Sequence, residues 1–396
     1  MIPRTLEFYL KRDASFYPVL TLTGPRQAGK TTLAQAAFPD HAYVSLEESD
    51  NRMLATDDPR GFLARYDGQV IIDEAQRAPD LLSYIQTAVD HDDSPGRFVL
   101  TGSHNLLLMQ HVSQSLAGRC GILHLLPFTR AELERQIQPE PLPPSELFPH
   151  QSTQRACWQT LRTGFYPRIH DHHIPPEIWL ADYVRTYVER DVRALVNVGD
   201  LDTFGRFLSL CAGRTGQLLS YSSLANDSGV SVDTARRWIS ILGTSFVTFL
   251  LRPHHLNYNK RLIKSPKLYF YDTGLACQLM GIRSDEQLPL HHARGALFEN
   301  YVVAEVAKTY LHHRRDPPIY FWRDRTGHEV DLLVEDGQEL YPVEIKSGET
   351  VHSSMMDGLR WWNGLTGNDP SRATLVHAGD TVAEHQGIQI KPWYAV

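Results

Sequence analysis

The sequence has few cysteines, and none of them suggests a disulfide framework. Only four cysteines occur among 396 residues, and they are scattered with no Cys-x-x-Cys pair. This usage favours reduced thiols in a cytoplasmic protein over a secreted, disulfide-stapled one. The sequence also lacks the apolar core of a signal peptide and any apolar run of membrane-spanning length. We therefore expect a cytoplasmic protein with no membrane partner.

An excess of positive charge is missing as well. The 39 Lys and Arg residues are outnumbered by 46 Asp and Glu residues, which gives a formal net charge of -7. This argues against a generally basic nucleic-acid binder, so any contact with nucleic acid must come from a local basic patch. A hydrophobic content of 42% is ordinary for a folded protein, and the length predicts two or three domains.

What the sequence does contain is a phosphate-binding pattern near its start. The pattern is Gly, four residues, then Gly-Lys-Thr, in the segment Gly24-Pro25-Arg26-Gln27-Ala28-Gly29-Lys30-Thr31-Thr32. It stands between an apolar strand and a helix, where backbone N–H groups and the helix N-terminus can surround phosphate oxygens. We expect Lys30 to reach the β- and γ-phosphates of ATP and the Thr31 hydroxyl to bind Mg²⁺.

A second pattern is an apolar run that ends in two carboxylates, Val70-Ile71-Ile72-Asp73-Glu74. A buried parallel strand reads as a continuous apolar run, and ligands bind at the carboxyl ends of such strands. We expect Asp73 to hold Mg²⁺ through its water shell and Glu74 to polarise the attacking water as general base. An acidic strand end that faces solvent is the alternative.

Two later strands carry polar residues suited to nucleotide hydrolysis. Ser103, and after it Asn105, follows a strand that would lie between the two motif strands if the sheet has an inserted strand. There Ser103 would act as a sensor of the γ-phosphate or the attacking water. Arg119 precedes the next strand, which is the place of a finger arginine that reaches a neighbouring subunit's γ-phosphate. A helix-terminal arginine that binds carbonyl groups is the alternative.

These motifs together resemble a prokaryotic family of AAA-type ATPases. The resemblance is carried by Leu22-Thr23-Gly24-Pro25-Arg26-Gln27-Ala28-Gly29-Lys30-Thr31, Ile72-Asp73-Glu74-Ala75-Gln76, Leu100-Thr101-Gly102-Ser103 and Leu116-Ala117-Gly118-Arg119. It implies an α/β fold with a P-loop ATPase core at residues 1–135, ATP and Mg²⁺ as cofactors, and a C-terminal domain of unassigned function. A homo-oligomer is expected, with a hexamer as one form, because a finger acting between subunits needs a neighbour.

The middle of the chain begins at a proline-rich break, which indicates a linker. The family resemblance implies that residues 136–205 form a helical lid and this linker. Its candidates for a second nucleotide sensor are Arg168, Arg190 and Arg193. Each can equally well be interpreted as a charged residue on an amphipathic helix. Residues 218–242 match a helix-turn-helix, so a winged helix is expected at residues 206–290. Its basic candidates for DNA contact are Arg236, Arg237, Lys260, Arg261 and Lys264. A lid or protein-contact module is the alternative.

The last part, residues 291–396, is expected to form a restriction-endonuclease-like α/β domain. Alternation along its third strand places Glu344 and Lys346 on one face, and a hairpin would bring Asp331 beside them. This arrangement resembles the Asp…Glu-x-Lys pattern of the restriction-endonuclease superfamily. Asp331 and Glu344 would bind Mg²⁺ together with Glu299, and Lys346 would position the water or offset charge. An ion pair on a solvent-facing strand is the alternative.

The sequence as a whole predicts an ATP hydrolase that couples Mg-ATP turnover to binding and remodelling or translocation of DNA. One alternative is a nucleotide-dependent switch or defence protein that controls a metal-dependent nuclease or a protein partner. Another makes the C-terminal half a non-catalytic interaction module. All three share the ATP site and differ in what the rest of the chain contacts.

Overall fold

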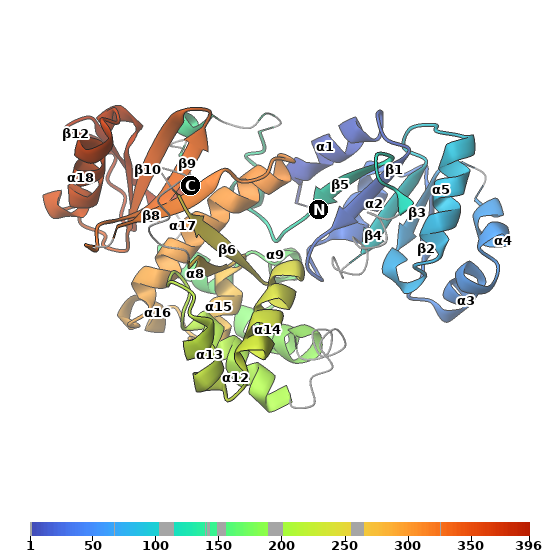
Figure 1. Cartoon of the computed structure of the whole chain (residues 1–396), viewed down its shortest axis with the longest axis horizontal. Coiled ribbons are helices and arrows are strands. Elements are labelled where there is room, and N and C mark those ends of the chain that lie inside the picture. The colour runs from blue at the N-terminus through green and yellow to red at the C-terminus, as the bar shows by residue number, and fades with distance from the viewer. Residues whose placement is uncertain are drawn as a thin grey trace. The chain divides into compact units, whose positions relative to one another are not determined.

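The computed structural model describes residues 2–66, 68–102, 115–138, 140, 143–148, 156–188, 201–254, 265–324 and 326–396. The chain divides into two compact units (Figure 1). Unit 1 comprises Met1–Pro139, Thr244–Phe246 and Tyr310–Arg315, and unit 2 comprises Glu140–Gly243, Val247–Thr309 and Asp316–Val396. The expected boundaries after residues 205 and 290 both fall inside unit 2.

Unit 1 is built on a parallel five-stranded sheet in the order β2-β3-β4-β1-β5. Its strands are β1 (Val19–Thr23), β2 (Ala42–Ser45), β3 (Val70–Asp73), β4 (Phe98–Gly102) and β5 (Cys120–His124). Strands β1 and β4 are buried along their whole length, as expected for a parallel sheet covered on both faces. Strand β4 lies between β1 and β3, which is the inserted-strand order on which the sensor prediction depends.

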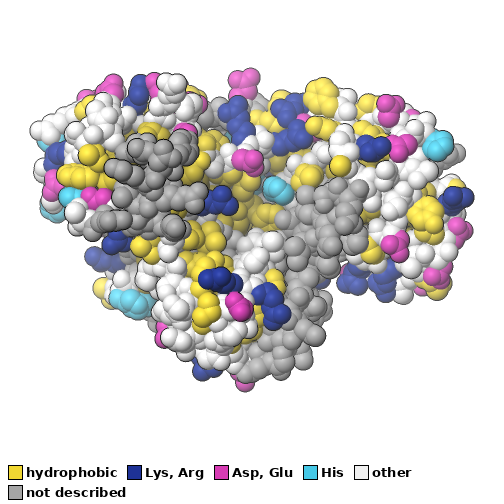
Figure 2. Space-filling model, in the orientation of Figure 1, with side chains coloured by type: hydrophobic (Ala, Val, Ile, Leu, Met, Phe, Trp, Pro, Cys, Tyr) yellow, Lys and Arg dark blue, Asp and Glu magenta, His cyan; other side chains and the backbone are white. Residues whose placement is uncertain are grey.

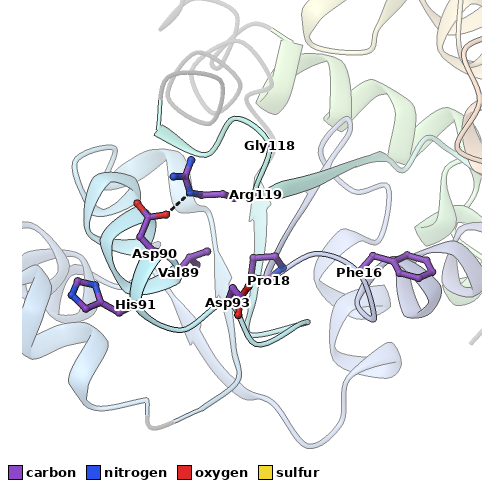
Figure 3. Close-up of a pocket in the computed structure, with 8 residues that line it drawn as sticks. All are labelled: Phe16, Pro18, Val89, Asp90, His91, Asp93, Gly118 and Arg119. Atoms are coloured by element: carbon purple, nitrogen blue, oxygen red, sulfur yellow. Dashed lines mark hydrogen bonds and ion pairs between the residues drawn. The ribbon is translucent and has the colours of Figure 1, made fainter.

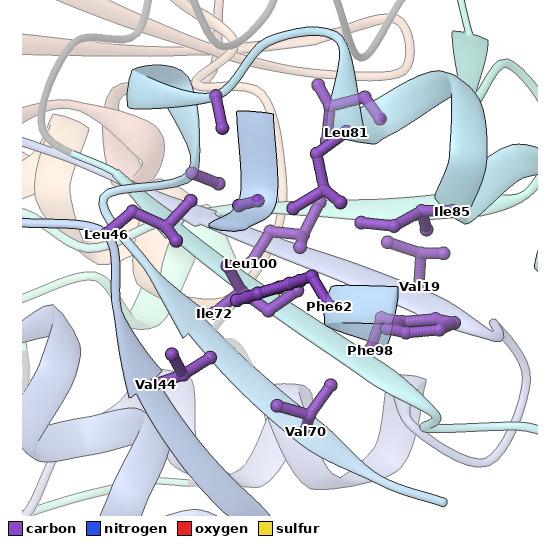
Figure 4. Close-up of a cluster of buried hydrophobic side chains, with 14 of the residues drawn as sticks. Val19, Val44, Leu46, Phe62, Val70, Ile72, Leu81, Ile85, Phe98 and Leu100 are labelled. Carbon is purple, nitrogen blue, oxygen red and sulfur yellow. The ribbon is translucent and has the colours of Figure 1, made fainter. Parts of the chain in front are cut away.

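Helices cover both faces of this sheet. They are α1 (Thr5–Asp13), α2 (Lys30–Ala37), α3 (Ser49–Asp57), α4 (Pro59–Ala64) and α5 (Leu81–His91), with the short turn η1 (Ala75–Arg77). The short helix α7 (Arg130–Leu133) follows β5. Side chains of α1 and α2 share one apolar core with β1 and β5, and those of α3, α4 and α5 share another with β3 and β4. Figure 4 shows the second core, where Phe62 and Ile85 lie against the strand residues Ile72 and Phe98.

Unit 2 contains a mixed eight-stranded sheet in the order β12-β13-β11-β10-β9-β8-β6-β7. Its strands are β6 (Thr248–Pro253), β7 (Lys267–Phe270), β8 (Ile319–Arg323), β9 (Glu329–Asp336), β10 (Glu339–Lys346), β11 (Thr374–His377), β12 (Ala383–His385) and β13 (Ile388–Pro392). The expected hairpin forms between β9 and β10, and β11 pairs in parallel with both β10 and β13. The α/β class, with a P-loop-type parallel sheet and a C-terminal mixed sheet, is confirmed.

The helices of unit 2 include the expected helix-turn-helix pair. They are α8 (Cys157–Thr163), α9 (Pro167–His172), α10 (Pro176–Tyr183), α12 (Leu201–Ala212), α13 (Tyr221–Ser228), α14 (Val232–Thr244), α15 (Thr273–Leu279), α16 (Gln287–Leu290), α17 (Arg294–His312) and α18 (Asp357–Thr366). The turn between α13 and α14 begins at Gly229, whose φ of 75° suits glycine. Strand β6 pairs with both β7 and β8, so the expected wing strands belong to the large sheet. None of the helices in the described ranges has the length and apolarity of a membrane span.

Candidate functional site

The phosphate-binding loop leaves β1 and runs directly into α2. Gly24 has a φ of 147°, and a Cβ atom there would lie 1.9 Å from the carbonyl oxygen of Leu125, so only glycine fits. Gly29, with a φ of 91°, precedes the first helical residue, Lys30. The Lys30 ammonium donates hydrogen bonds of 3.0 and 2.8 Å to the carbonyl oxygens of Gly24 and Pro25. The loop therefore curls around this lysine.

Lys30 is only 7% exposed, and its burial changes its acid–base behaviour. Burial lowers the pKa of Lys30 to about 8, although the carboxylates of Glu74 and Asp73 act in the opposite direction. A phosphate group bound beside the ammonium would favour its charged form. Nucleotide binding and protonation of Lys30 are therefore coupled.

Asp73, at the end of β3, accepts hydrogen bonds from three hydroxyl groups. Its Oδ1 accepts from Thr31 at 3.1 Å and also from Thr101. Its Oδ2 accepts from Tyr43 at 3.1 Å. A threonine hydroxyl beside a carboxylate is the pair of oxygen ligands that Mg²⁺ takes in P-loop sites, so the residues present fit this ion.

Thr101 and Tyr43 are site residues that the sequence analysis does not identify. Thr101 is part of β4, two positions before the expected sensor Ser103, and a hydroxyl near the end of an apolar strand is the signal that could identify it. Tyr43 lies on β2, and its place becomes clear only from the parallel register that sets Ser45 beside Asp73. Burial, together with the Asp73 carboxylate, raises the pKa of Tyr43 to about 12, so this hydroxyl stays protonated. Ser103 and Asn105 lie outside the described residues.

Glu74, the expected general base, directly follows β3. Its φ of 56° lies in the left-handed region, so the chain turns sharply at this residue. The Glu74 carboxylate accepts a hydrogen bond from the side-chain amide of Gln76. The carboxylate is thus held in place next to Asp73.

Arg119 lies at the amino ends of the parallel strands, whereas the phosphate-binding loop lies at their carboxyl ends. Its carbonyl oxygen accepts a hydrogen bond of 3.3 Å from the N–H of Val19, which begins β1, whereas the loop follows the end of β1. A five-residue strand spans about 16 Å, which is too far for an arginine side chain to reach the phosphates of its own subunit. Any finger role of Arg119 must therefore be played in a neighbouring subunit.

The Arg119 side chain lines a hollow of about 570 Å³. Its Nε atom lies 2.5 Å from Oδ1 of Asp90, and Figure 3 shows these two side chains facing one another. Its Nη1 also donates a hydrogen bond of 3.3 Å to the carbonyl oxygen of Ala117. The Arg119 side chain is about one-third exposed, so it is accessible to a neighbouring molecule.

Two of the candidates for DNA contact lie on α14, the second helix of the helix-turn-helix. Arg236 and Arg237 are both exposed, and the Arg236 guanidinium lies over the Tyr221 ring, 5.4 Å from its centroid. Figure 2 shows basic and acidic side chains interspersed over the visible face. Lys260, Arg261 and Lys264 lie outside the described residues, as do Arg190 and Arg193 among the second-sensor candidates. Arg168 lies on α9 of unit 2.

Unit 2 brings Asp331, Glu344 and Lys346 together on β9 and β10. The Lys346 ammonium contacts Glu344 and lies 3.9 Å from Oδ2 of Asp331. The same Oδ2 accepts a hydrogen bond of 2.8 Å from the backbone N–H of Ile345. Burial, reinforced by the Asp331 carboxylate, raises the pKa of Glu344 to about 8 and that of Glu299 to about 7.

The same region contains Lys267 and Tyr269 on β7, which the sequence analysis does not assign to it. Glu299, from α17, accepts a hydrogen bond of 2.8 Å from Lys267 and one of 2.5 Å from Tyr269. Within the described part of the chain, no three His, Cys, Asp or Glu residues are grouped so that they could hold a metal ion. Metal binding by Glu299, Asp331 and Glu344 thus stays a prediction. The structure places the Lys267 ammonium beside Glu299 as well.

Three protein-family profiles match the chain. One, described as AAA domain, matches residues 17–134, and two described as domains of unknown function, DUF8612 and DUF4143, match residues 154–286 and 294–396. Two relatives are the uncharacterized proteins Rv2008c of Mycobacterium tuberculosis and Mb2031c of Mycobacterium bovis. Each is 33% identical over 356 residues, which cover 88% of this chain and 75% of the relative. The chain belongs to this family of AAA-domain proteins.

Membership of the AAA-domain family confirms the resemblance found in the motifs. Among solved structures, the Walker-type ATPase PABY2304 of Pyrococcus abyssi is 15% identical with a TM-score of 0.39, covering 70% of this chain and 96% of its own. The RuvB Holliday junction branch migration motor of Thermotoga maritima is 22% identical with a TM-score of 0.31, covering 63% and 86%. Both likenesses are too weak to carry an argument. The AAA domain itself supports ATP as the bound nucleotide.

Proposed function

We propose that this AAA-domain protein hydrolyses ATP with Mg²⁺ and couples turnover to binding and remodelling or translocation of DNA. The observation that carries hydrolysis is the 3.1 Å contact between Thr31 and Asp73 beside the phosphate-binding loop. A loop that only binds phosphate needs no carboxylate at this point. Phosphoryl transfer does need one, because an ion must be held against the phosphates.

Each residue of the site has a distinct task in this proposal. Thr31 and Asp73 would hold the ion, which when bound neutralises charge on the phosphates. The Lys30 ammonium would exchange its two carbonyl partners for phosphate oxygens. Thr101 would keep the Asp73 carboxylate oriented. Glu74 would accept a proton from the attacking water.

The proposed assembly is a homo-oligomer in which Arg119 completes the site of a neighbouring subunit. The support is that Arg119 lies at the amino ends of the strands, too far from the phosphate-binding loop to contact a nucleotide bound in its own subunit. A hexameric ring is one assembly that would give every site such an arginine. An arginine supplied in this way raises turnover by roughly 10³ to 10⁵ in related enzymes.

The proposed partner is DNA, bound through the helix-turn-helix of α13 and α14. The support is that Arg236 and Arg237 are exposed on the second helix, the one that such motifs place in the major groove. Guanidinium groups there could neutralise phosphates, even though the chain as a whole is acidic. We also propose that unit 2 contains a winged helix and a restriction-endonuclease-like domain.

An ATPase assay on a panel of DNA structures tests the proposal. Turnover is expected to rise several-fold with at least one of single-stranded, duplex and branched DNA. The Arg236→Ala, Arg237→Ala double variant should lose this stimulation and keep its basal rate, whereas Arg283→Ala, an exposed arginine elsewhere in unit 2, should keep both. If no DNA changes the rate, the DNA part of the proposal fails and the ATPase part stands.

The second candidate is a nucleotide-dependent switch in which unit 2 acts as a nuclease or contacts a protein partner. The observation that favours it is the proximity of Asp331, Glu344 and Lys346 on one hairpin. Nicking of DNA that requires a divalent ion and disappears in Lys346→Ala would support the nuclease. DNA that stays intact across metal ions and nucleotides would exclude it and leave the protein partner.

A further inference from the structure

Lys267 is a buried cation inside the carboxylate cluster of unit 2, by which we mean Glu299, Glu329, Asp331 and Glu344. Its side chain is only 3% exposed. Its ammonium lies 2.8 Å from Oε1 of Glu299 and 2.5 Å from Oε1 of Glu329. An unpaired ammonium at this depth would be very costly, so these contacts account for its presence there.

The carboxylates keep Lys267 charged despite its burial. Burial alone disfavours an ammonium, and its ion pairs with the Glu299 and Glu329 carboxylates offset that cost. The ammonium also lies 5.5 Å from the centroid of the Phe321 ring, on the neighbouring strand β8. A positive charge is thus fixed at this point.

Oε1 of Glu299 already accepts two hydrogen bonds from side chains of β7. Lys267 and Tyr269 lie two positions apart on β7, so their side chains point to the same face of the strand. Both donate to Oε1 of Glu299, the tyrosine hydroxyl at 2.5 Å. A divalent ion would have to displace both donors to bind this oxygen.

Other cations contact one oxygen of each remaining carboxylate. Lys346 contacts Glu344 and approaches Asp331, and Arg323 lies 3.3 Å from Oε2 of Glu329. Three cationic side chains therefore meet four carboxylates. The cluster reaches near-neutrality with its own residues and lacks the uncompensated negative charge that attracts a divalent ion.

We propose that the Lys267 ammonium takes the place of a divalent ion in this cluster, so that unit 2 functions without a metal ion bound there. An ammonium and a divalent ion that contact the same carboxylate oxygens repel each other, so the resident ammonium opposes binding of the ion. This inference does not depend on the ATPase proposal. It narrows the second candidate function, since a face without a metal ion can bind a partner but lacks the means for metal-assisted cleavage.

Tryptophan fluorescence allows a test that reports on unit 2 within the full chain. All seven tryptophans belong to this unit: Trp158, Trp179, Trp238, Trp322, Trp361, Trp362 and Trp393. Without nucleotide, Mn²⁺ should shift the thermal midpoint of the wild-type signal by less than about 1 °C. It should raise the midpoint of Lys267→Met by about 3 °C or more, because the carboxylates lose their resident cation.

Lys308→Met is the matched control for this experiment. Lys308 is another fully buried lysine of unit 2, outside this cluster, and it pairs with the carboxylate of Glu305 at 2.5 Å. Its replacement should create no response to Mn²⁺. A folded Lys267→Met variant that also shows no response would overturn the proposal.

A measurement on the wild type keeps the proposal testable if Lys267→Met does not fold. Equilibrium dialysis would compare Mn²⁺ binding by the wild type and by Asp331→Asn, both without nucleotide. Equal binding by the two proteins is the expected result. Additional Mn²⁺ bound by the wild type and lost in Asp331→Asn would show that the cluster does hold a metal ion and would overturn the proposal.

Discussion

The Arg4 guanidinium donates a hydrogen bond of 3.1 Å to the carbonyl oxygen of Ala28, in the middle of the phosphate-binding loop. It also donates one of 2.5 Å to the carbonyl oxygen of Leu126 and lies 3.3 Å from the buried carboxylate of Glu132. The backbone N–H of Thr5 donates to the same carboxylate at 2.9 Å. The residue that precedes α1 therefore ties the loop to the segment after β5.

Replacing Arg4 with methionine is expected to weaken ATP binding and to destabilise unit 1. Although burial opposes ionisation, Arg4 and His312 hold the pKa of Glu132 well below its usual range. Without Arg4 this buried charge loses a partner, which should cost about 3 kcal/mol of unfolding free energy. Urea denaturation followed by circular dichroism and titration with a fluorescent ATP analogue measure the two effects.

The control for Arg4→Met is Lys11→Met, on the exposed side of α1. Lys11 pairs with Glu7 at 2.7 Å in an exposed helical i, i+4 contact. Its loss should change the unfolding free energy by no more than about 0.5 kcal/mol and leave ATP affinity intact. If Arg4→Met behaves like this control, the loop does not depend on the Arg4 contact.

Thr101→Val is expected to reduce the rate of ATP hydrolysis more than it reduces ATP affinity. The substitution keeps the shape of a buried strand residue but removes the hydrogen bond to Oδ1 of Asp73. A misplaced Asp73 carboxylate should lower kcat about tenfold, since a lost hydrogen bond to a charged group is worth about 1.5 kcal/mol or more. Thr21→Val, in the neighbouring strand β1, is the control, because its hydroxyl contacts Cys120 instead. Equal kcat values for the two variants would contradict the role of Thr101.

ATP affinity is expected to fall as the pH rises through about 8. Lys30 has a lowered pKa of about 8 in the free protein, and bound phosphates should raise it because they favour the ammonium. Protonated Lys30 is then the binding form, so affinity is nearly full below about pH 7 and falls about tenfold between pH 7 and pH 9. Calorimetry in buffers of different ionisation enthalpy should detect proton uptake on binding at pH 9. Lys30→Met should bind weakly at every pH and show no such uptake.

The sheet of unit 1 could be predicted because its signals are local. The apolar runs before Gly24 and at Val70–Asp73 indicate buried parallel strands, and each motif directly follows its strand. The neighbours of Asp73 could not be predicted in this way. Tyr43 and Thr101 reach it from two other strands, and which residues meet across a sheet depends on a register that no single segment encodes.

Unit 2 shows the same division between local and long-range information. The period-two alternation of β10 and the turn at Gly337 predict the hairpin that brings Asp331 to Lys346. The sequence around Lys267, by contrast, shows only a basic stretch next to an apolar strand. Its ion pair with Glu299 joins β7 to α17, and its ion pair with Glu329 joins β7 to β9, which lies far along the chain. A local pattern does not carry that information.

Arg119→Ala is expected to lower ATP turnover by about a thousandfold and to leave ATP affinity nearly unchanged, because the arginine would act on a neighbour's phosphate in the transition state. A malachite-green assay and a titration with a fluorescent ATP analogue separate the two quantities. Arg97→Ala is the matched control, since Arg97 is another partly exposed arginine of unit 1 and pairs with Asp92 at 3.3 Å. Its turnover should stay within about twofold of the wild type.

Mixing two inactive variants distinguishes an arginine that acts on a neighbouring subunit from one that only stabilises the fold of its own subunit. Lys30→Ala removes the phosphate contact but retains Arg119, and Arg119→Ala retains an intact loop. In a mixed oligomer, Lys30→Ala subunits can supply the arginine that neighbouring Arg119→Ala sites lack, so activity should rise well above that of either variant alone. If Arg119 instead stabilises unit 1 through Asp90, its pair at 2.5 Å, Asp90→Ala should lower turnover as strongly and mixing should restore nothing. Arg119 precedes β5 and lies beside the start of β1, at the opposite end of that strand from the loop. This position favours the first outcome, because the side chain is too short to reach its own loop.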